Sequence, residues 1–263
     1  MIVEVFLRVT LCCLCVTLCL SCSEERSDSK PHQPTHTLVF MDKSLSTNSN
    51  LDYVAQKYNT VLDGIVAENV RTTGDQITVY FIHENTAQAR ALSLTVRSEK
   101  DDVGNASPTD VEAAQMAFDL SLQREKARFR KKLAAKLAQQ NTGLSNQRTD
   151  VLASISLIAE AGADGDPVTV YYLSDMVESM PARLNDQAPR RDFHKTPPAT
   201  EAQADEWAKA DVKTFADLSF GSPTIRIALP FEPTASRKVN NPAVSRYWQT
   251  LFGELGAAEV EEL

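Results

Sequence analysis

Strand-like and helix-like patterns alternate along the chain from about residue 36, and this alternation limits the fold more than any other feature. Short apolar or β-branched runs, which are typical of strands, lie at 37–41, 76–83, 91–96, 168–174 and 224–229. Apolar residues at helical spacing indicate helices at 50–70, 107–140, 149–161, 201–218 and 240–255. Strands separated by helices predict a three-layer α/β fold, in which a doubly wound, mostly parallel sheet is covered on both faces.

One pair of strands departs from this alternation. No helical pattern separates 76–83 from 91–96, and a short connection joins antiparallel neighbours. We therefore expect one antiparallel strand at an edge of the sheet. The formal net charge of the chain is −8, which disfavours nucleic acid as a partner because a polyanion would be repelled.

The amino-terminal segment indicates export. All five cysteines lie within residues 12–22, so the rest of the chain can hold neither a disulfide nor a cysteine-ligated metal. The apolar run 9–21 is too short to span a bilayer and suits the core of a signal peptide. It ends in Leu-Cys-Leu-Ser-Cys at 18–22, which resembles a bacterial lipobox. That resemblance implies lipidation of Cys22, although Cys19 replaces the usual aliphatic residue; the alternative is a short uncleaved anchor.

The domain order follows from these patterns. We expect a signal peptide at 1–22, a flexible tether at 23–35, one domain at 36–255 and an acidic tail at 256–263. The helical pattern at 107–140 is long for a globular helix. The tether is polar and acidic, which resembles the surface-export signal of Bacteroidetes lipoproteins; the alternative is an ordinary linker.

A polar motif follows the first strand directly. It reads Asp42-Lys43-Ser44-Leu45-Ser46, and ligands in open α/β sheets bind beyond the carboxyl ends of the strands. A carboxylate and two hydroxyls at alternate positions can converge on one hard cation. Because hydroxyls are neutral ligands, such a cation still attracts an anionic oxygen from outside. The simpler alternative is that the two serines cap a turn or a helix. We expect Lys43 to be either a solvated charge or a charge that lies beside the metal ligands without binding the metal.

This motif resembles the metal-ion-dependent adhesion site of von Willebrand factor type A (vWA) domains, which reads Asp-x-Ser-x-Ser after the first strand. The family completes its site with a threonine in a later loop and an aspartate at the end of the fourth strand. Thr149 and Asp175 hold those places in this chain, with Thr142 as the alternative threonine. The resemblance covers about residues 36–255, and it implies that Mg²⁺, or else Mn²⁺ or Ca²⁺, is held by Asp42, Ser44, Ser46, Thr149 and Asp175. It also implies a partner that supplies a carboxylate.

The chain departs from the family pattern in three places. Met176 stands where the family has glycine after the aspartate, and the threonine segment lacks its usual glycine. The interval from Ser46 to Thr149 is also longer than usual, and the helix at 107–140 accounts for the excess. That helix carries a basic run at 124–132, which is either a solvated face or a contact for an acidic partner or anionic lipid.

Three functions remain open from the sequence. The first is a non-enzymatic, metal-dependent binding module in the bacterial cell envelope, anchored by lipid to a membrane and most simply placed at the outer membrane or cell surface. The second is a metal-free scaffold in an envelope complex. The third is a hydrolase that activates water with the metal, but the sequence offers no general base near Asp42.

Overall fold

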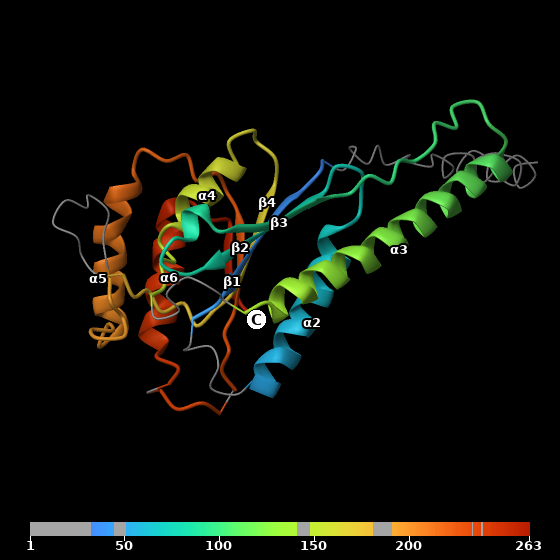
Figure 1. Ribbon diagram of the computed structural model, residues 1–263. Coiled ribbons are helices and arrows are strands. Elements are labelled where there is room, and N and C mark those ends of the chain that lie inside the picture. Colours follow the sequence, from blue (N-terminus) through green and yellow to red (C-terminus); the bar gives the residue numbers. More distant parts are fainter. Residues whose placement is uncertain (1–32, 45–50, 141–147, 181–190, 233, 238) are drawn as a thin grey trace, which may run out of the picture. The chain divides into compact units, whose positions relative to one another are not determined.

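A six-stranded sheet organises residues 33–263 (Figure 1). The computed structural model describes residues 33–44, 51–140, 148–180, 191–232, 234–237 and 239–263. The strands are β1 (His36–Asp42), β2 (Gln76–Ile82), β3 (Arg90–Thr95), β4 (Val168–Leu173), β5 (Thr224–Ala228) and β6 (Glu259–Glu262). Their order is β3-β2-β1-β4-β5-β6, and only β3 runs antiparallel to its neighbour. The predicted three-layer α/β fold with one antiparallel edge strand is confirmed.

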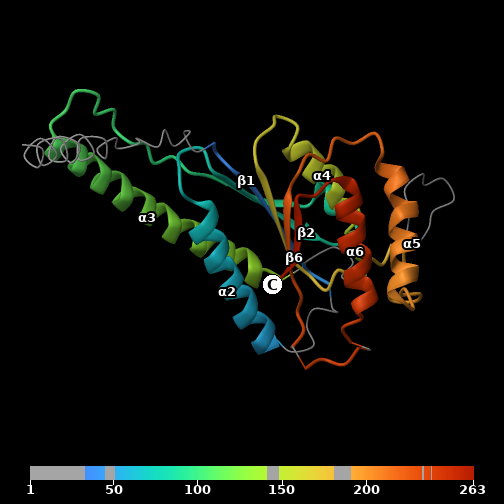
Figure 2. The same cartoon turned by 180° about the vertical axis from the view of Figure 1, so that it is seen from behind.

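Helices cover both faces of the sheet (Figures 1 and 2). One face carries α2 (Leu51–Asn69) and α3 (Pro108–Ala138); the other carries α4 (Ser154–Ala161), α5 (Glu201–Val212) and α6 (Pro242–Leu255). Successive strand residues point to opposite faces, so Leu38 and Phe40 pack with α4–α6 while Val39 and Met41 pack with α2 and α3. Burial on both faces explains why these strands are continuous apolar runs in the sequence.

An aromatic stack joins α6 to the centre of the sheet. Phe40 and Tyr172 stack with ring centroids 5.0 Å apart, and Tyr172 and Phe252 follow at 5.7 Å. Trp248 stacks on Phe252 at 5.5 Å. Offset aromatic pairs add to the stabilisation from burial alone, so this stack fixes α6 against β1 and β4.

The helix predicted at 149–161 begins later, at Ser154. The Thr149 amide donates to Ser179 Oγ at 2.8 Å, and the Asp150 amide donates to the His83 carbonyl at 3.2 Å. These tertiary bonds hold the segment in an extended loop before the helix starts. The helix predicted at 201–218 likewise ends at Val212, and a 3-10 turn at Lys213–Phe215 follows.

The segment 256–263 is not the acidic tail that the sequence predicted. Gly256 ends α6 with a left-handed φ of 103°, and β6 then pairs in parallel with β5. Arg226 of β5 forms an ion pair with Glu261 at 3.5 Å. Charged side chains are common on edge strands because they discourage further strand pairing, so the acidic composition did not exclude a strand.

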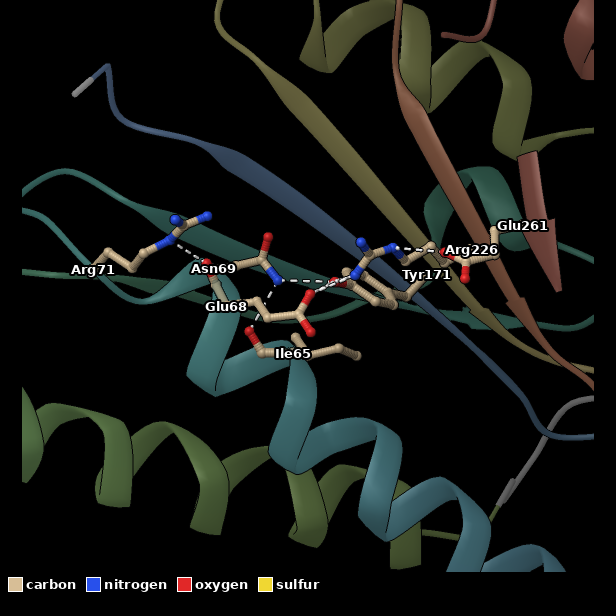
Figure 3. A network of polar contacts seen from close by, with 7 residues as sticks. All are labelled: Ile65, Glu68, Asn69, Arg71, Tyr171, Arg226 and Glu261. Carbon is tan, nitrogen blue, oxygen red and sulfur yellow. Dashed lines mark hydrogen bonds and ion pairs between the residues drawn. The ribbon is translucent and has the colours of Figure 1, made fainter. Parts of the chain in front are cut away.

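A group of paired polar side chains, which we call the polar cross-link, ties α2 to β4, β5 and β6 (Figure 3). Tyr171 Oη accepts hydrogen bonds from Asn69 Nδ2 and from Arg226 Nη1, both at 3.0 Å. It also donates to Glu68 Oε2 at 3.4 Å. Arg226 completes the group through ion pairs with Glu68 and Glu261.

Helix α3 is much longer than α2, with 31 residues against 19. At 1.5 Å per residue the two helices are about 46 Å and about 28 Å long, and the amino-terminal half of α3 extends beyond the end of α2 (Figures 1 and 2). A capping box between Ser107 and Asp110 starts α3, and its buried residues are Leu122, Phe129 and Leu133. No helix in the described part of the chain is long and apolar enough to cross a membrane.

Candidate functional site

The candidate site lies at the carboxyl edge of the sheet, between β1 and β4. The chain leaves β1 through α2 to reach β2 on one side, and it leaves β4 through α5 to reach β5 on the other. Neighbouring strands whose connections lead in opposite directions leave a crevice at their carboxyl ends, where open α/β sheets bind ligands. Asp42 is the last residue of β1, and Asp175 follows two residues after β4 ends.

Asp42 is a buried carboxylate with an unfavourable charge. Its Oδ1 accepts a hydrogen bond from the Ser44 amide and its Oδ2 accepts one from Ser174 Oγ, both at 2.7 Å. Burial, and next the negative charge of Asp175, raise the pKa of Asp42 to about 7 in spite of these hydrogen bonds. Two carboxylates therefore share one buried edge, and the charge of Asp175 makes the charged form of Asp42 less favourable.

Thr149 reaches the same edge from a separate loop. Its amide and carbonyl both bond to Ser179, at 2.8 and 2.9 Å, while the next residue bonds to His83 at the end of β2. The loop therefore spans from β2 to the segment after β4, and β1 lies between those two strands. The Thr149 side chain is 1% exposed, and its hydroxyl has no hydrogen-bond partner among the described residues.

The predicted site residues thus fall into two groups. Asp42, Ser44 and Asp175 are buried and interact with one another through hydrogen bonds or charge, and Thr149 lies at the same edge of the sheet. Ser46, the alternative Thr142 and the lipobox Cys22 lie outside the described residues.

Tyr58 lies near this site, although its helical spacing in the sequence predicts only a core position. It lies in α2 in the same buried cluster as Met41 and Leu173, at 3% exposure. Its hydroxyl has no hydrogen-bond partner in the described part of the chain. Burial, followed by the charges of Asp42 and Asp175, raises its pKa well above the ordinary value. Helical spacing places a tyrosine ring in the core, but it carries no signal that the hydroxyl lacks a partner.

Of the two roles expected for Lys43, the structure contradicts that of a solvated charge. Its Nζ donates to the carbonyls of Lys136 and Leu137, at 3.0 and 2.7 Å, and lies 5.0 Å from the ring centre of Phe81. Burial lowers the pKa of Lys43 to about 8. A cation that bonds the last carbonyls of a helix stabilises its carboxyl end, so Lys43 joins the Asp42–Ser44 segment to the end of α3.

Met176 adopts the backbone conformation for which glycine is the usual choice. Its φ is 58°, in the left-handed region, which costs about 1–2 kcal/mol for a residue with a Cβ atom. The side chain is buried in the α4–α6 core, and its carbonyl accepts a hydrogen bond of 2.7 Å from Trp248 Nε1. Burial and this hydrogen bond offset the strain, so the turn after Asp175 is kept without glycine.

The oxygen set suits a hard divalent cation. No three His, Cys, Asp or Glu side chains gather as metal ligands within the described ranges, so a transition-metal site of that kind is absent there. Two carboxylates with serine and threonine hydroxyls are instead the ligand type that Mg²⁺ or Ca²⁺ accepts. The raised pKa of Asp42 and the unpartnered hydroxyl of Thr149 fit a cation in this place.

Comparison with known proteins gives only distant likenesses. No family model and no curated protein matches the chain. Among solved structures, an aerotolerance-related membrane protein from Bacteroides fragilis is 12% identical and has a TM-score of 0.34, with 86% of this chain and 90% of that protein covered. A PilB minor pilin from Streptococcus sanguinis is 9% identical with a TM-score of 0.38, covering 89% and 57%. A von Willebrand factor type A protein from Catenulispora acidiphila is 13% identical with a TM-score of 0.31, covering 84% and 43%. Because these TM-scores are low, the fold is assigned from the strand order of this structure alone.

Proposed function

We propose that this protein is a vWA-like binding module that holds Mg²⁺, or else Mn²⁺ or Ca²⁺, at the β1–β4 edge and uses it to bind an acidic group of a partner. The residues proposed to hold the cation are Asp42, Ser44, Ser46, Thr149 and Asp175. The observation that carries the proposal is the buried Thr149 hydroxyl, which has no partner among the described residues and stands at an edge that already holds two carboxylates. Buried polar groups are nearly always hydrogen-bonded, and an exception often marks a missing ion or water.

The ligand chemistry explains why the partner would be acidic. A bound cation would offset the repulsion between Asp42 and Asp175 that raises the pKa of Asp42. The hydroxyl ligands add no negative charge, so the cation keeps its attraction for a further anionic oxygen. Tyr58 adds a hydroxyl near both aspartates, which can donate a hydrogen bond to that oxygen or to a water beside it.

We further propose that the module acts in the bacterial cell envelope. The support is the lipobox-like segment at 18–22, which would place a lipid on Cys22, and the polar tether that follows it. The outer membrane or the cell surface is the proposed location. Metabolic labelling with a palmitate analogue tests the lipid anchor. Labelling of the wild type that is lost in Cys22→Ser would support the anchor, and equal labelling of both would contradict it.

Calorimetry tests the cation site. Mg²⁺ and Mn²⁺ should bind the wild type and the control Asp63→Ala, which removes an exposed carboxylate of α2 that pairs with Arg130. Neither cation should bind Asp42→Ala. The cation-loaded wild type should then bind a polyglutamate peptide but not a polyglutamine peptide. Equal cation binding by the wild type and Asp42→Ala would refute the proposal.

A metal-free scaffold is the competing proposal, and one observation favours it. Both oxygens of Asp42 already accept hydrogen bonds from the protein, so the edge is partly satisfied without a cation. In that case a chelator would leave the binding of protein partners unchanged. The hydrolase hypothesis has no such support, and turnover of a panel of phosphate and ester substrates would be needed to revive it.

A further inference from the structure

The amino-terminal half of α3 carries exposed apolar side chains. Met116 is 60% exposed and Leu120 is 55% exposed, and residues four apart lie on the same face of a helix. Val111 is exposed as well. These three are half of the six large hydrophobic side chains that are exposed among the described residues. Met116 and Leu120 therefore form an exposed apolar pair on one face of α3, which is a candidate interaction surface.

The two halves of α3 also differ in charge. Residues 108–123 contain three acidic residues and no lysine or arginine, namely Asp110, Glu112 and Asp119. Residues 124–138 contain one acidic residue, Glu125, and seven basic ones: Arg124, Lys126, Arg128, Arg130, Lys131, Lys132 and Lys136. The helix is therefore negative at one half and positive at the other.

Only part of the basic half serves the fold of its own chain. Arg130 pairs with Asp63 of α2, Arg128 pairs with Glu125, and Lys126 donates weakly to the Ala67 carbonyl at 3.5 Å. Arg124 and Lys131 lie exposed on α3. The basic half thus presents positive charge outward while its buried residues Phe129 and Leu133 pack inward.

We infer that α3 is a self-association surface, through which two copies of this chain pair with their α3 helices antiparallel. An antiparallel pair places the acidic half of each helix beside the basic half of the other, and two-fold symmetry makes that contact twice. Met116 and Leu120 are then covered at the centre of the contact. A parallel pair would set like charges side by side, and an anionic membrane would repel the acidic half that carries the apolar residues.

This inference is independent of the proposed cation site, because none of the proposed ligands lies on α3. The pairing should weaken as salt is added, since exposed charges are screened within about 10 Å at 0.1 M salt. A contact made by the amino-terminal apolar segment 9–21 would not show the charge dependence that is tested below.

Co-purification of two differently tagged copies of the full chain tests the pairing. Wild-type copies should co-purify at low salt. The acid-to-base variant Glu112→Lys with Asp119→Lys should lose co-purification with itself, and so should the base-to-acid variant Arg124→Glu with Lys131→Glu. Mixing the two variants should restore co-purification, because each helix then supplies the charges that the other lacks. That recovery also shows that both variants are folded.

A matched pair of apolar changes tests the centre of the contact. Met116→Glu with Leu120→Glu should reduce co-purification to background, whereas Val239→Glu should not, although Val239 is equally exposed at 55%. The inference is overturned if wild-type copies fail to co-purify, or if all α3 variants co-purify as the wild type does. The inference is also overturned if the two charge variants do not co-purify with each other after mixing.

Discussion

The polar cross-link and the candidate site each contain a tyrosine that packs between α2 and the sheet, and the two hydroxyls differ in one respect. In the polar cross-link the Tyr171 hydroxyl has three hydrogen-bond partners, and Arg226 balances the charge of Glu68. In the candidate site the Tyr58 hydroxyl has no partner among the described residues, and two carboxylates stand close together. In the first group the tyrosine hydroxyl is fully bonded and the group ties α2 to the sheet. In the second group the hydroxyls of Tyr58 and Thr149 have no partner among the described residues, and a ligand can supply one.

The largest expected effect is on the dependence of stability on pH. The pKa of Asp42 is about 7 in the folded chain against an ordinary 3.8, so the folded chain binds this proton more tightly than the unfolded chain. The free energy of unfolding of the cation-free wild type should therefore fall as the pH rises from about 4 to about 7, and then level off.

The free energy of unfolding of Asp42→Asn should not fall in this way as the pH rises, because the amide does not ionise. At pH 8 without cation it should be more stable than the wild type, by an amount on the order of a few kcal/mol. Urea unfolding at pH 4, 6 and 8 measures the difference. Mg²⁺ should stabilise the wild type at pH 8 and leave Asp42→Asn unchanged. Parallel pH profiles for the two proteins would contradict this account of Asp42.

The matched tyrosine changes should give the next largest difference. Tyr171→Phe removes the shared partner of Asn69 and Arg226, and it should cost about 1–3 kcal/mol of stability. Tyr58→Phe removes a hydroxyl that bonds to no described residue, and without cation it should change stability by less than about 0.5 kcal/mol. Chemical denaturation measures both. Polyglutamate binding by the cation-loaded protein should weaken in Tyr58→Phe and stay unchanged in Tyr171→Phe; the reverse order would refute the contrast.

Thr149→Val should have the smallest effect on the cation-free protein. Valine has nearly the shape of threonine, and the lost hydroxyl makes no hydrogen bond with the described residues, so stability should change by less than about 0.5 kcal/mol. The affinity for Mn²⁺ should nevertheless fall, by about tenfold or more. Ser154→Ala is the control, because its hydroxyl bonds to Tyr172 at 2.5 Å inside the α4 core. It should lower stability and leave Mn²⁺ affinity intact.

The sequence predicted most of the fold because the patterns of β1 to β5 are local. Asp42 and Asp175 each follow a buried apolar run, and the rule for carboxyl ends of parallel strands was enough to place them at one edge. That they hold a cation stays a prediction. The position of Thr149 depends on bonds to Ser179 and His83, which are distant in sequence, and no local pattern reveals them. The same holds for β6, whose pairing with β5 comes from tertiary contact rather than from composition.

The contact between Lys43 and α3 has a mechanical consequence. The half-buried ammonium of Lys43 bonds to two carbonyls in the last turn of α3, and Lys43 is next to Asp42 in the chain. A slide of α3 along its axis by about 1.5 Å, the rise of one residue, would stretch both bonds beyond their normal length. Lys43 would then lose these two acceptors, or it would pull the backbone of residues 42–44 with it. If the proposed cation binds, any partner that displaces α3 would therefore alter cation affinity, and the cation would alter the affinity for that partner to the same degree.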